Sequence, residues 1–268
     1  MKTVTIGKKE IVLKEEWIIG FVTTWIVGLL AHAYRFFNFL PIWDSIYNFT
    51  GVGSTYTLGR WFLGYAGLIT SMFDLPWING AFSLFYISIV VILVTEIFEI
   101  KNKGMIALCA ALFVSFPTVV SSFAYMYTAD AYLLAFLLST VAIYLTWRVR
   151  KWGMIAGMVC LAFAMGIYQA YATVAIVLVL LYIIRQFVIE KLDFLEAVRR
   201  DLKYLGTLVG GAVLYVVILK ITLIRYNITL PSYQGIGSMG IMSLGQYKAA
   251  LQKTLYQQKQ YLQHIHQY

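Results

Sequence analysis

Three of the twelve acidic residues stand apart from the others. Asp44, Asp74 and Asp130 follow or precede apolar segments, whereas the other nine alternate with basic residues: Glu10, Glu15, Glu16, Glu96, Glu99, Glu190, Asp193, Glu196 and Asp201. Asp44 follows Trp43 in a loop rich in aromatic and hydroxyl residues, where a partly desolvated carboxylate is suited to act as general base for a hydroxyl. Asp130 opens an apolar segment among tyrosines, and we expect a catalytic role for it too. The alternative for all three is helix capping.

Arginines and aromatic residues accompany these acids. Arg60 is the one basic residue of its loop, and a guanidinium at the depth of lipid head groups binds phosphate in a bidentate manner. Arg35 and Arg225 lie near the ends of apolar segments and are candidates for the same contact, although such side chains also snorkel without binding anything. Aromatic faces stack on sugar rings, and polar side chains hydrogen-bond with a ligand. Four residues are therefore candidates for binding a sugar or an acceptor: Trp43, Tyr127, Tyr168 and Gln169.

The elements that must position these residues are helices in a membrane. The chain of 268 residues is 61% hydrophobic and 12% charged, with a mean hydropathy of +0.77, and a soluble domain carries about twice that charge fraction. Because a bilayer core needs roughly 20 apolar residues per helix, the sequence predicts an all-α polytopic protein with about seven spans: Trp17–Leu40, Ala81–Ile100, Met105–Phe123, Ala131–Trp147, Trp152–Gly166, Ala170–Phe187 and Leu205–Ile224. We expect a kink at Pro117.

Basic residues orient these spans. Reading the N-terminus as cytoplasmic places fourteen of the 21 Lys and Arg residues in cytoplasmic segments: Lys2, Lys8, Lys9, Lys14, Lys101, Lys103, Arg148, Arg150, Lys151, Arg185, Lys191, Arg199, Arg200 and Lys203. This bias follows the positive-inside rule. The bias explains the net charge of +9, so the charge does not indicate a protein that binds nucleic acid. The same orientation puts the candidate residues on the outer face. We further expect two interfacial helices, Thr57–Phe73 outside and Ile189–Lys203 inside.

The remaining features concern metals and domains. Neither the two cysteines nor the three histidines have the spacing of a metal site. The sequence therefore predicts no metal ligands; a divalent ion is compatible with the candidate site but not supported by it. We divide the chain into a transmembrane module, residues 1–225, and a polar outer tail, residues 226–268, which we expect to be the start of a region truncated in this chain.

Four stretches carry a resemblance to a known family. In order, Trp43-Asp-Ser, Gly59-Arg-Trp, Tyr127-Thr-Ala-Asp-Ala-Tyr and Gly166-Ile-Tyr-Gln-Ala resemble the bacterial Gtr type II glucosyl transferases, which are GT-C glycosyltransferases. The resemblance covers roughly residues 17–225, although Ser45 stands where the family often has a second acid. It implies a GT-C-like fold in the bacterial plasma membrane and an undecaprenyl-phosphate glucose donor. It also implies a cell-surface acceptor such as O-antigen, cell-wall polysaccharide or teichoic acid.

Two other functions use similar residues. A transporter or flippase for a lipid-linked sugar would need the same aromatic and basic side chains, but transporters commonly show internal repeats and broken helices at the midplane. A non-catalytic membrane component of a glycan-assembly complex would not depend on Asp44, Arg60 or Asp130. The sequence shows no internal repeat, and its polar residues gather outside the apolar segments, so we expect the glycosyltransferase.

Overall fold

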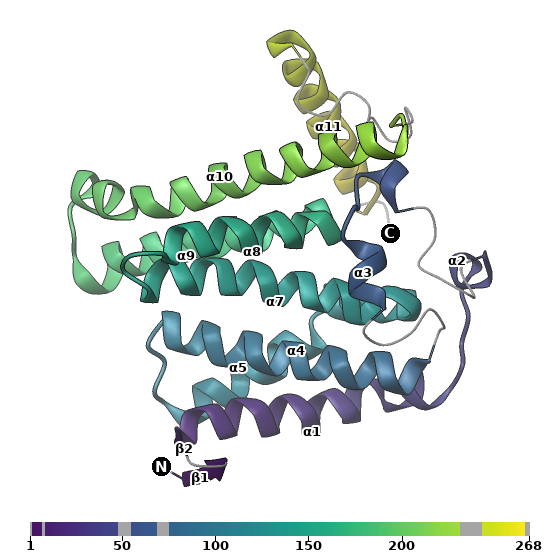
Figure 1. Ribbon diagram of the computed structural model, residues 1–268. Coiled ribbons are helices and arrows are strands. Elements are labelled where there is room, and N and C mark those ends of the chain that lie inside the picture. Colours follow the sequence, from purple (N-terminus) through teal and green to yellow (C-terminus); the bar gives the residue numbers. More distant parts are fainter. Residues whose placement is uncertain (1, 7–8, 48–54, 69–74, 231–242, 266–268) are drawn as a thin grey trace. The chain divides into compact units, whose positions relative to one another are not determined.

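Figure 1 shows a computed structural model of the chain, which describes residues 2–6, 9–47, 55–68, 75–230 and 243–265. Asp74 and the last part of the predicted Thr57–Phe73 helix lie outside these residues. Backbone contacts divide the chain into two units, Met1–Ile228 and Thr229–Tyr268. The described part of the second unit contains helix α11, Leu244–Ile265.

The first unit is a bundle of long helices that a β-hairpin precedes. Strands β1 (Lys2–Ile6) and β2 (Lys9–Leu13) pair in antiparallel fashion. The long helices are α1 (Glu15–Phe37), α4 (Pro76–Ile97), α5 (Lys103–Ser115), α7 (Met126–Arg148), α8 (Gly153–Ile167), α9 (Ala172–Arg185) and α10 (Phe194–Tyr226). Short helical segments join them: α2 (Trp43–Tyr47), η1 (Tyr56–Leu58), α3 (Leu63–Gly67), α6 (Pro117–Ser122), η2 (Phe123–Tyr125), η3 (Gln169–Tyr171) and a π-helical turn, η4 (Gln186–Glu190). The prediction of helices is confirmed, and the hairpin is an element that the sequence analysis did not predict.

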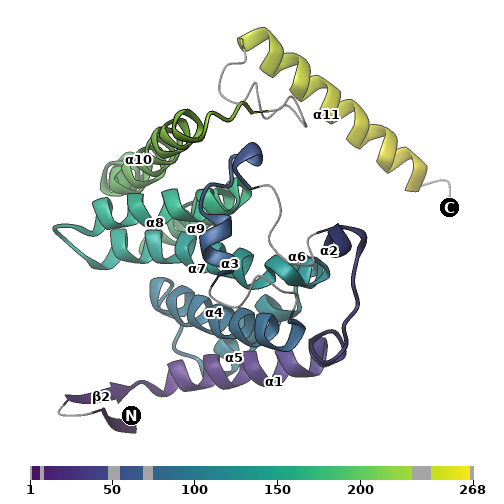
Figure 2. The same cartoon turned by 45° about the vertical axis from the view of Figure 1, so that its right-hand side comes forward.

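Helix α7 lies in the middle of the bundle. It packs against α4 and α8, while α1 packs against α4 and α5, and α10 packs against α8. Figures 1 and 2 show successive long helices running in opposite directions, so the connections fall at two ends of the bundle. Leu84, Ile87, Leu133 and Ile143 are among the fully buried side chains of the core between α4 and α7.

Within the described ranges, five helical stretches are long and apolar enough to cross a membrane: Glu15–Phe37, Pro76–Ile97, Lys103–Arg148, Gln169–Glu190 and Leu195–Tyr226. The third has 46 residues and contains both α5 and α7, whereas α8 is apolar but shorter than a full span. These stretches are compatible with a multi-pass membrane protein. Each of the seven predicted segments overlaps one long helix, but seven crossings stay a prediction.

The chain's prolines and asparagines mark where several helices begin. Pro76 and Pro117 stand in the first turns of α4 and α6, where the missing N–H has no intrahelical role. Asn102 caps α5, since its side chain accepts a hydrogen bond from the backbone N–H of Met105. The kink expected at Pro117 is therefore a complete break, with Phe116 in an extended conformation between α5 and α6.

Two expectations about interfacial helices are wrong. The predicted Ile189–Lys203 helix is not separate from the last span, because α10 runs without a break from Phe194 to Tyr226. The described part of Thr57–Phe73 is not one surface helix either. It forms η1 and α3, and Trp61 and Leu63 are buried against the bundle. Trp61 and Phe62 pack against Phe163 of α8, whereas Tyr65 is exposed.

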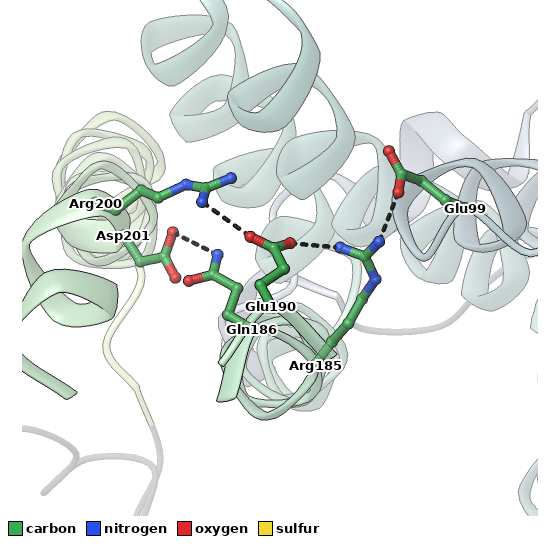
Figure 3. A network of polar contacts seen from close by, with 6 residues as sticks. All are labelled: Glu99, Arg185, Gln186, Glu190, Arg200 and Asp201. Carbon is green, nitrogen blue, oxygen red and sulfur yellow. Dashed lines mark hydrogen bonds and ion pairs between the residues drawn. The ribbon is translucent and has the colours of Figure 1, made fainter. Parts of the chain in front are cut away.

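Ion pairs gather at one end of the bundle, where α1, α5 and α10 begin and α4 and α9 end; we call it the basic end. Figure 3 shows its largest network, in which Arg185 pairs with Glu99 at 2.5 Å and with Glu190 at 2.9 Å, and Arg200 pairs with Glu190 at 3.0 Å. Lys14–Glu96 and Lys103–Glu15 pairs join the same end. These contacts hold the helix ends together. The opposite end of the bundle carries the candidate residues, and we call it the site end.

Candidate active site

Residues 55–68 form a loop across the site end, which we call the Arg60 loop. The backbone N–H of Phe62 donates a hydrogen bond to the carbonyl of Gly166, with an N···O distance of 2.8 Å. The Trp61 ring covers Gly166 so closely that a Cβ added there would lie 2.7 Å from the ring carbons. Glycine is therefore required at the end of α8, and the loop is fastened to that helix by a close backbone approach.

Arg60 lies in a cradle of tyrosines. Its guanidinium is 4.3 Å from the centre of the Tyr168 ring, and its Nη1 donates a hydrogen bond to the Tyr132 hydroxyl at 3.1 Å. The rings of Tyr132 and Tyr168 are stacked, with centres 5.4 Å apart. The Arg60 Nε is buried and has no hydrogen-bond partner among the described residues. A cation held by aromatic faces in this way keeps an N–H donor for which the described residues supply no acceptor.

The turn before Arg60 is built on Gly59, which has a φ of +71°. The Tyr215 hydroxyl donates to the Gly59 carbonyl at 3.0 Å. The Gln169 Nε2 donates to the Leu58 carbonyl at 2.8 Å and to the Tyr215 hydroxyl at 2.9 Å. The structure thus gives the amide of Gln169, which we expected to bind a sugar or acceptor, two partners inside the protein.

Two tyrosines of the Arg60 loop add polar groups to the site end. The ring of Tyr56 stacks on Tyr226, at the end of α10, with ring centres 5.1 Å apart. A hydrogen bond with Tyr65 raises the pKa of the Tyr56 hydroxyl to about 12.

Asp44 lies in the first turn of α2, where its side chain is exposed. The neighbouring Trp43 side chain is 72% exposed. Tyr127, at the start of α7, lies within electrostatic range of both the Asp44 carboxylate and the Arg60 guanidinium. The structure therefore brings three of the predicted site residues, Asp44, Arg60 and Tyr127, to one region of the site end, with Tyr168 beside Arg60.

Asp130 has a different environment. Its side chain is only 1% exposed, and its Oδ1 accepts a hydrogen bond from Asn79 Nδ2 at 2.9 Å. Asn79 in turn accepts a hydrogen bond from the backbone N–H of Leu75, at the start of α4. This buried carboxylate joins α7 to the first turn of α4, a place that favours a supporting role over direct contact with a substrate.

The other two predicted phosphate ligands lie elsewhere. Arg35, at the end of α1, donates from Nε to the Phe123 carbonyl at 2.8 Å, from Nη2 to the Ala124 carbonyl at 3.1 Å, and from Nη1 to the Leu40 carbonyl. These bonds tie α1 to the segment before α7. Arg225 is exposed in the last turn of α10, next to the Tyr226 that stacks on Tyr56. Of the three arginines, Arg60 alone combines a fixed cradle with a buried N–H donor that lacks a partner in the described chain.

The sequence analysis missed Asn79 and Tyr215. Both are polar residues inside apolar helices, and a buried tyrosine hydroxyl usually finds a hydrogen-bond partner. That signal shows that a partner exists, but it does not say which one, because Tyr215 bonds to a residue 156 positions away.

No group of three His, Cys, Asp or Glu residues that could hold a metal ion occurs within the residues that the structure describes.

The chain was compared with known proteins in three ways. The family model described as "Glucosyl transferase GtrII" matches residues 33–266. Neither the curated proteins nor the solved structures gave a match. The matched range contains every candidate residue discussed above, from Arg35 to Arg225. The chain belongs to the GtrII glucosyl transferase family.

Proposed function

We propose that this protein is an integral membrane glucosyltransferase that moves glucose from a polyprenyl-phosphate donor to a cell-surface glycan on the outer face of the bacterial plasma membrane. Membership of the GtrII family supports glucosyl transfer as the reaction, and the long apolar helices are compatible with a multi-pass membrane protein. The donor class, the acceptor and the face are the proposed parts. The observation that supports the donor class is the cradle that holds Arg60.

The Arg60 cradle suits a lipid-linked phosphate. Phosphate oxygens are acceptors that pair with an arginine through two parallel hydrogen bonds. Arg60 keeps a buried Nε–H without a partner among the described residues, while Tyr132 and Tyr168 fix the plane of its guanidinium. A donor that enters between helix ends would place its phosphate there and leave its lipid tail in the hydrocarbon.

The sugar would then face Asp44 and the aromatic residues near it. Trp43 and Tyr127 offer aromatic surface on the side of the acid, and Tyr168 offers it on the side of the arginine. Sugar rings stack on such faces and hydrogen-bond with tyrosine hydroxyls. Asp44 is exposed, so an acceptor hydroxyl from outside the bundle has access to it.

In this proposal Asp44 is the general base. Its carboxylate takes the proton of the acceptor hydroxyl, and the oxygen attacks the anomeric carbon of glucose with inversion. The bond between that carbon and the phosphate oxygen breaks, and polyprenyl phosphate leaves with the electron pair while Arg60 stabilises its charge. The proton on Asp44 passes to solvent. Because Asp130 is buried and bonded to Asn79, we assign it to placing the start of α7 and assign the base to Asp44 alone.

The distribution of charge supports the outer face. The ion pairs and basic residues of the helix ends gather at the basic end, and cytoplasmic loops are the ones that carry excess Lys and Arg. Arg60 lies at the opposite end. With the basic end in the cytoplasm, the N-terminus is cytoplasmic and the site faces outward.

Donor binding by the full chain in lipid nanodiscs tests the proposal. Decaprenyl-phosphate glucose is titrated against wild type, Arg60→Gln and Lys101→Gln; Lys101 is exposed near the basic end and serves as a matched loss of one positive charge. Charge-assisted hydrogen bonds are worth about 1.5–3 kcal/mol, so Arg60→Gln should weaken binding roughly 10- to 150-fold. Lys101→Gln should bind as wild type.

Two results would overturn the proposal. One is an Arg60→Gln variant that is folded and binds the donor as tightly as wild type. The other is wild-type protein that binds decaprenol, which lacks the phosphate, as well as it binds the phosphorylated donor.

A further inference from the structure

We infer that Gln169 and Tyr215 are positioning residues that lock the Gly59 turn and thereby fix the direction of the Arg60 guanidinium. The inference rests on the proposed function, because it gives Arg60 its role in donor binding. We call the two side chains and the carbonyls of Leu58 and Gly59 the Gly59 lock. It joins three parts of the chain: the Arg60 loop, the turn η3 after α8, and the middle of α10.

The hydrogen atoms of the lock have one arrangement. Main-chain carbonyls only accept, so the Tyr215 proton must point to Gly59 and the Gln169 amide must present its nitrogen to Leu58. The second Nε2 proton of Gln169 then meets the Tyr215 oxygen at 2.9 Å. Both amide protons and the hydroxyl proton are used. Since Tyr215 is 5% exposed, water does not readily replace any of these partners, and losing one leaves a buried group unsatisfied.

Gly59 fits the lock for two reasons. Its φ of +71° is the left-handed region that side chains disfavour. A Cβ at this position would also lie 2.7 Å from the Gln169 Nε2 and 2.9 Å from the Tyr215 hydroxyl. The two donors therefore occupy the space where any other residue would place its side chain.

Arg60 follows directly on the locked turn. Its backbone N–H donates to the Thr55 carbonyl at 2.9 Å, which closes the turn on the other side. With the backbone held at Gly59 and at Arg60, the side chain can reach both Tyr132 and Tyr168 while its Nε remains unbonded within the described chain. A donor that binds a group already held in place loses less free energy to ordering. The lock thus raises donor affinity without touching the donor.

The same geometry separates this role from the sugar-binding role that the sequence suggested for Gln169. Its two N–H groups are both used inside the protein. Replacing Gln169 with Glu keeps the shape but removes both donors and sets a carboxylate against the Leu58 carbonyl. Replacing Tyr215, which is buried in α10, removes instead the hydrogen bond to the Gly59 carbonyl.

A double-mutant cycle on the full chain in nanodiscs tests the lock, with decaprenyl-phosphate glucose as the probe. The variants are Tyr215→Phe, Arg60→Gln and the combination of the two. Tyr204→Phe is the matched control, because Tyr204 is another buried tyrosine of α10 and lies toward its other end. We expect Tyr215→Phe to raise the donor dissociation constant about tenfold, which corresponds to roughly 1.4 kcal/mol, and Tyr204→Phe to leave it unchanged.

The cycle distinguishes the lock from a purely structural tyrosine. If Tyr215 acts through Arg60, Tyr215→Phe has no further effect on donor affinity in the Arg60→Gln background. A Tyr215→Phe variant that binds the donor as wild type, or that weakens it equally in both backgrounds, overturns the inference. Gln169→Glu gives a second test, since it should weaken binding in the same Arg60-dependent way. Failure of Arg60→Gln itself to change affinity would overturn the proposed donor site instead.

Discussion

The substitution Gly59→Ala adds one methyl group at a position of the site end where both the backbone conformation and the neighbouring atoms disfavour a side chain. Gly59 has a φ of +71°, and the added Cβ would lie 2.7 Å from the Gln169 Nε2 and 2.9 Å from the Tyr215 hydroxyl. Real Cβ atoms do not keep such distances. The turn must therefore change its conformation, or at least one of the two donors must move away.

The cost follows from these two effects. Holding an alanine in the left-handed region costs about 1–2 kcal/mol. Displacing one donor forfeits a hydrogen bond worth about 0.5–1.5 kcal/mol. In the alanine variant, the original turn conformation is thus disfavoured by the sum of these costs, roughly 1.5–3.5 kcal/mol. A free-energy change of about 1.4 kcal/mol corresponds to a factor of ten in affinity. If the locked turn is the one that presents Arg60, Gly59→Ala should weaken binding of decaprenyl-phosphate glucose roughly 10- to 300-fold.

The assay is donor titration of the full chain in nanodiscs, alongside thermal unfolding of the same samples. Gly206→Ala is the matched control: it lies in α10, and its added Cβ would meet only the flexible end of Met154, at 3.0 Å. We expect the control to bind the donor as wild type. A folded Gly59→Ala protein with wild-type donor affinity would refute the reasoning that the turn sets the position of Arg60.

Two further predictions concern the acids of the site end. Asp44→Asn should lower the rate of glucose transfer about 10²- to 10⁴-fold and leave the donor dissociation constant unchanged. The rate is measured by release of polyprenyl phosphate in membrane vesicles that contain the native acceptor. An unchanged rate would remove Asp44 as the base. Asp130→Ala removes the acceptor of the Asn79 amide and should destabilise the protein by about 1–3 kcal/mol. Thermal unfolding in detergent measures this, and equal stability of wild type and variant would contradict it.

The sequence was sufficient for the helices of the bundle. Apolar runs locate each long helix because hydropathy and length report directly on burial in lipid or protein. The distribution of basic residues predicted that Lys14, Lys103 and Arg185 lie at the same end of the bundle, and their ion pairs do meet at the basic end. Ends of helices were less certain: α10 begins eleven residues before the predicted Leu205, since its charged first turns look like a separate amphipathic segment.

Only part of the site could be predicted from the sequence. Arg60 could be found because it is isolated among apolar residues, and Tyr168 because it stands in a polar break between two helices. That these two residues meet depends on the Arg60 loop packing into the bundle, which composition alone does not show. The partners of Asp130 and of Gly59 lie 51 and 156 residues away. No local pattern encodes such distances, so Asn79 and Tyr215 could not be assigned from one sequence.

The unbroken course of α10 has a mechanical consequence. At about 1.5 Å per residue its 33 residues extend for roughly 50 Å, whereas the hydrocarbon of a bilayer is about 30 Å thick. If α10 crosses the proposed membrane, it must either tilt steeply or extend beyond the hydrocarbon by several turns. One rigid rod then carries Arg200, in the ion-pair network of the basic end, and Tyr215, in the lock beside Arg60. In the proposed membrane setting, any change in bilayer thickness that tilts this rod would move both contacts together, so bilayer composition would act on Arg60, the proposed phosphate ligand.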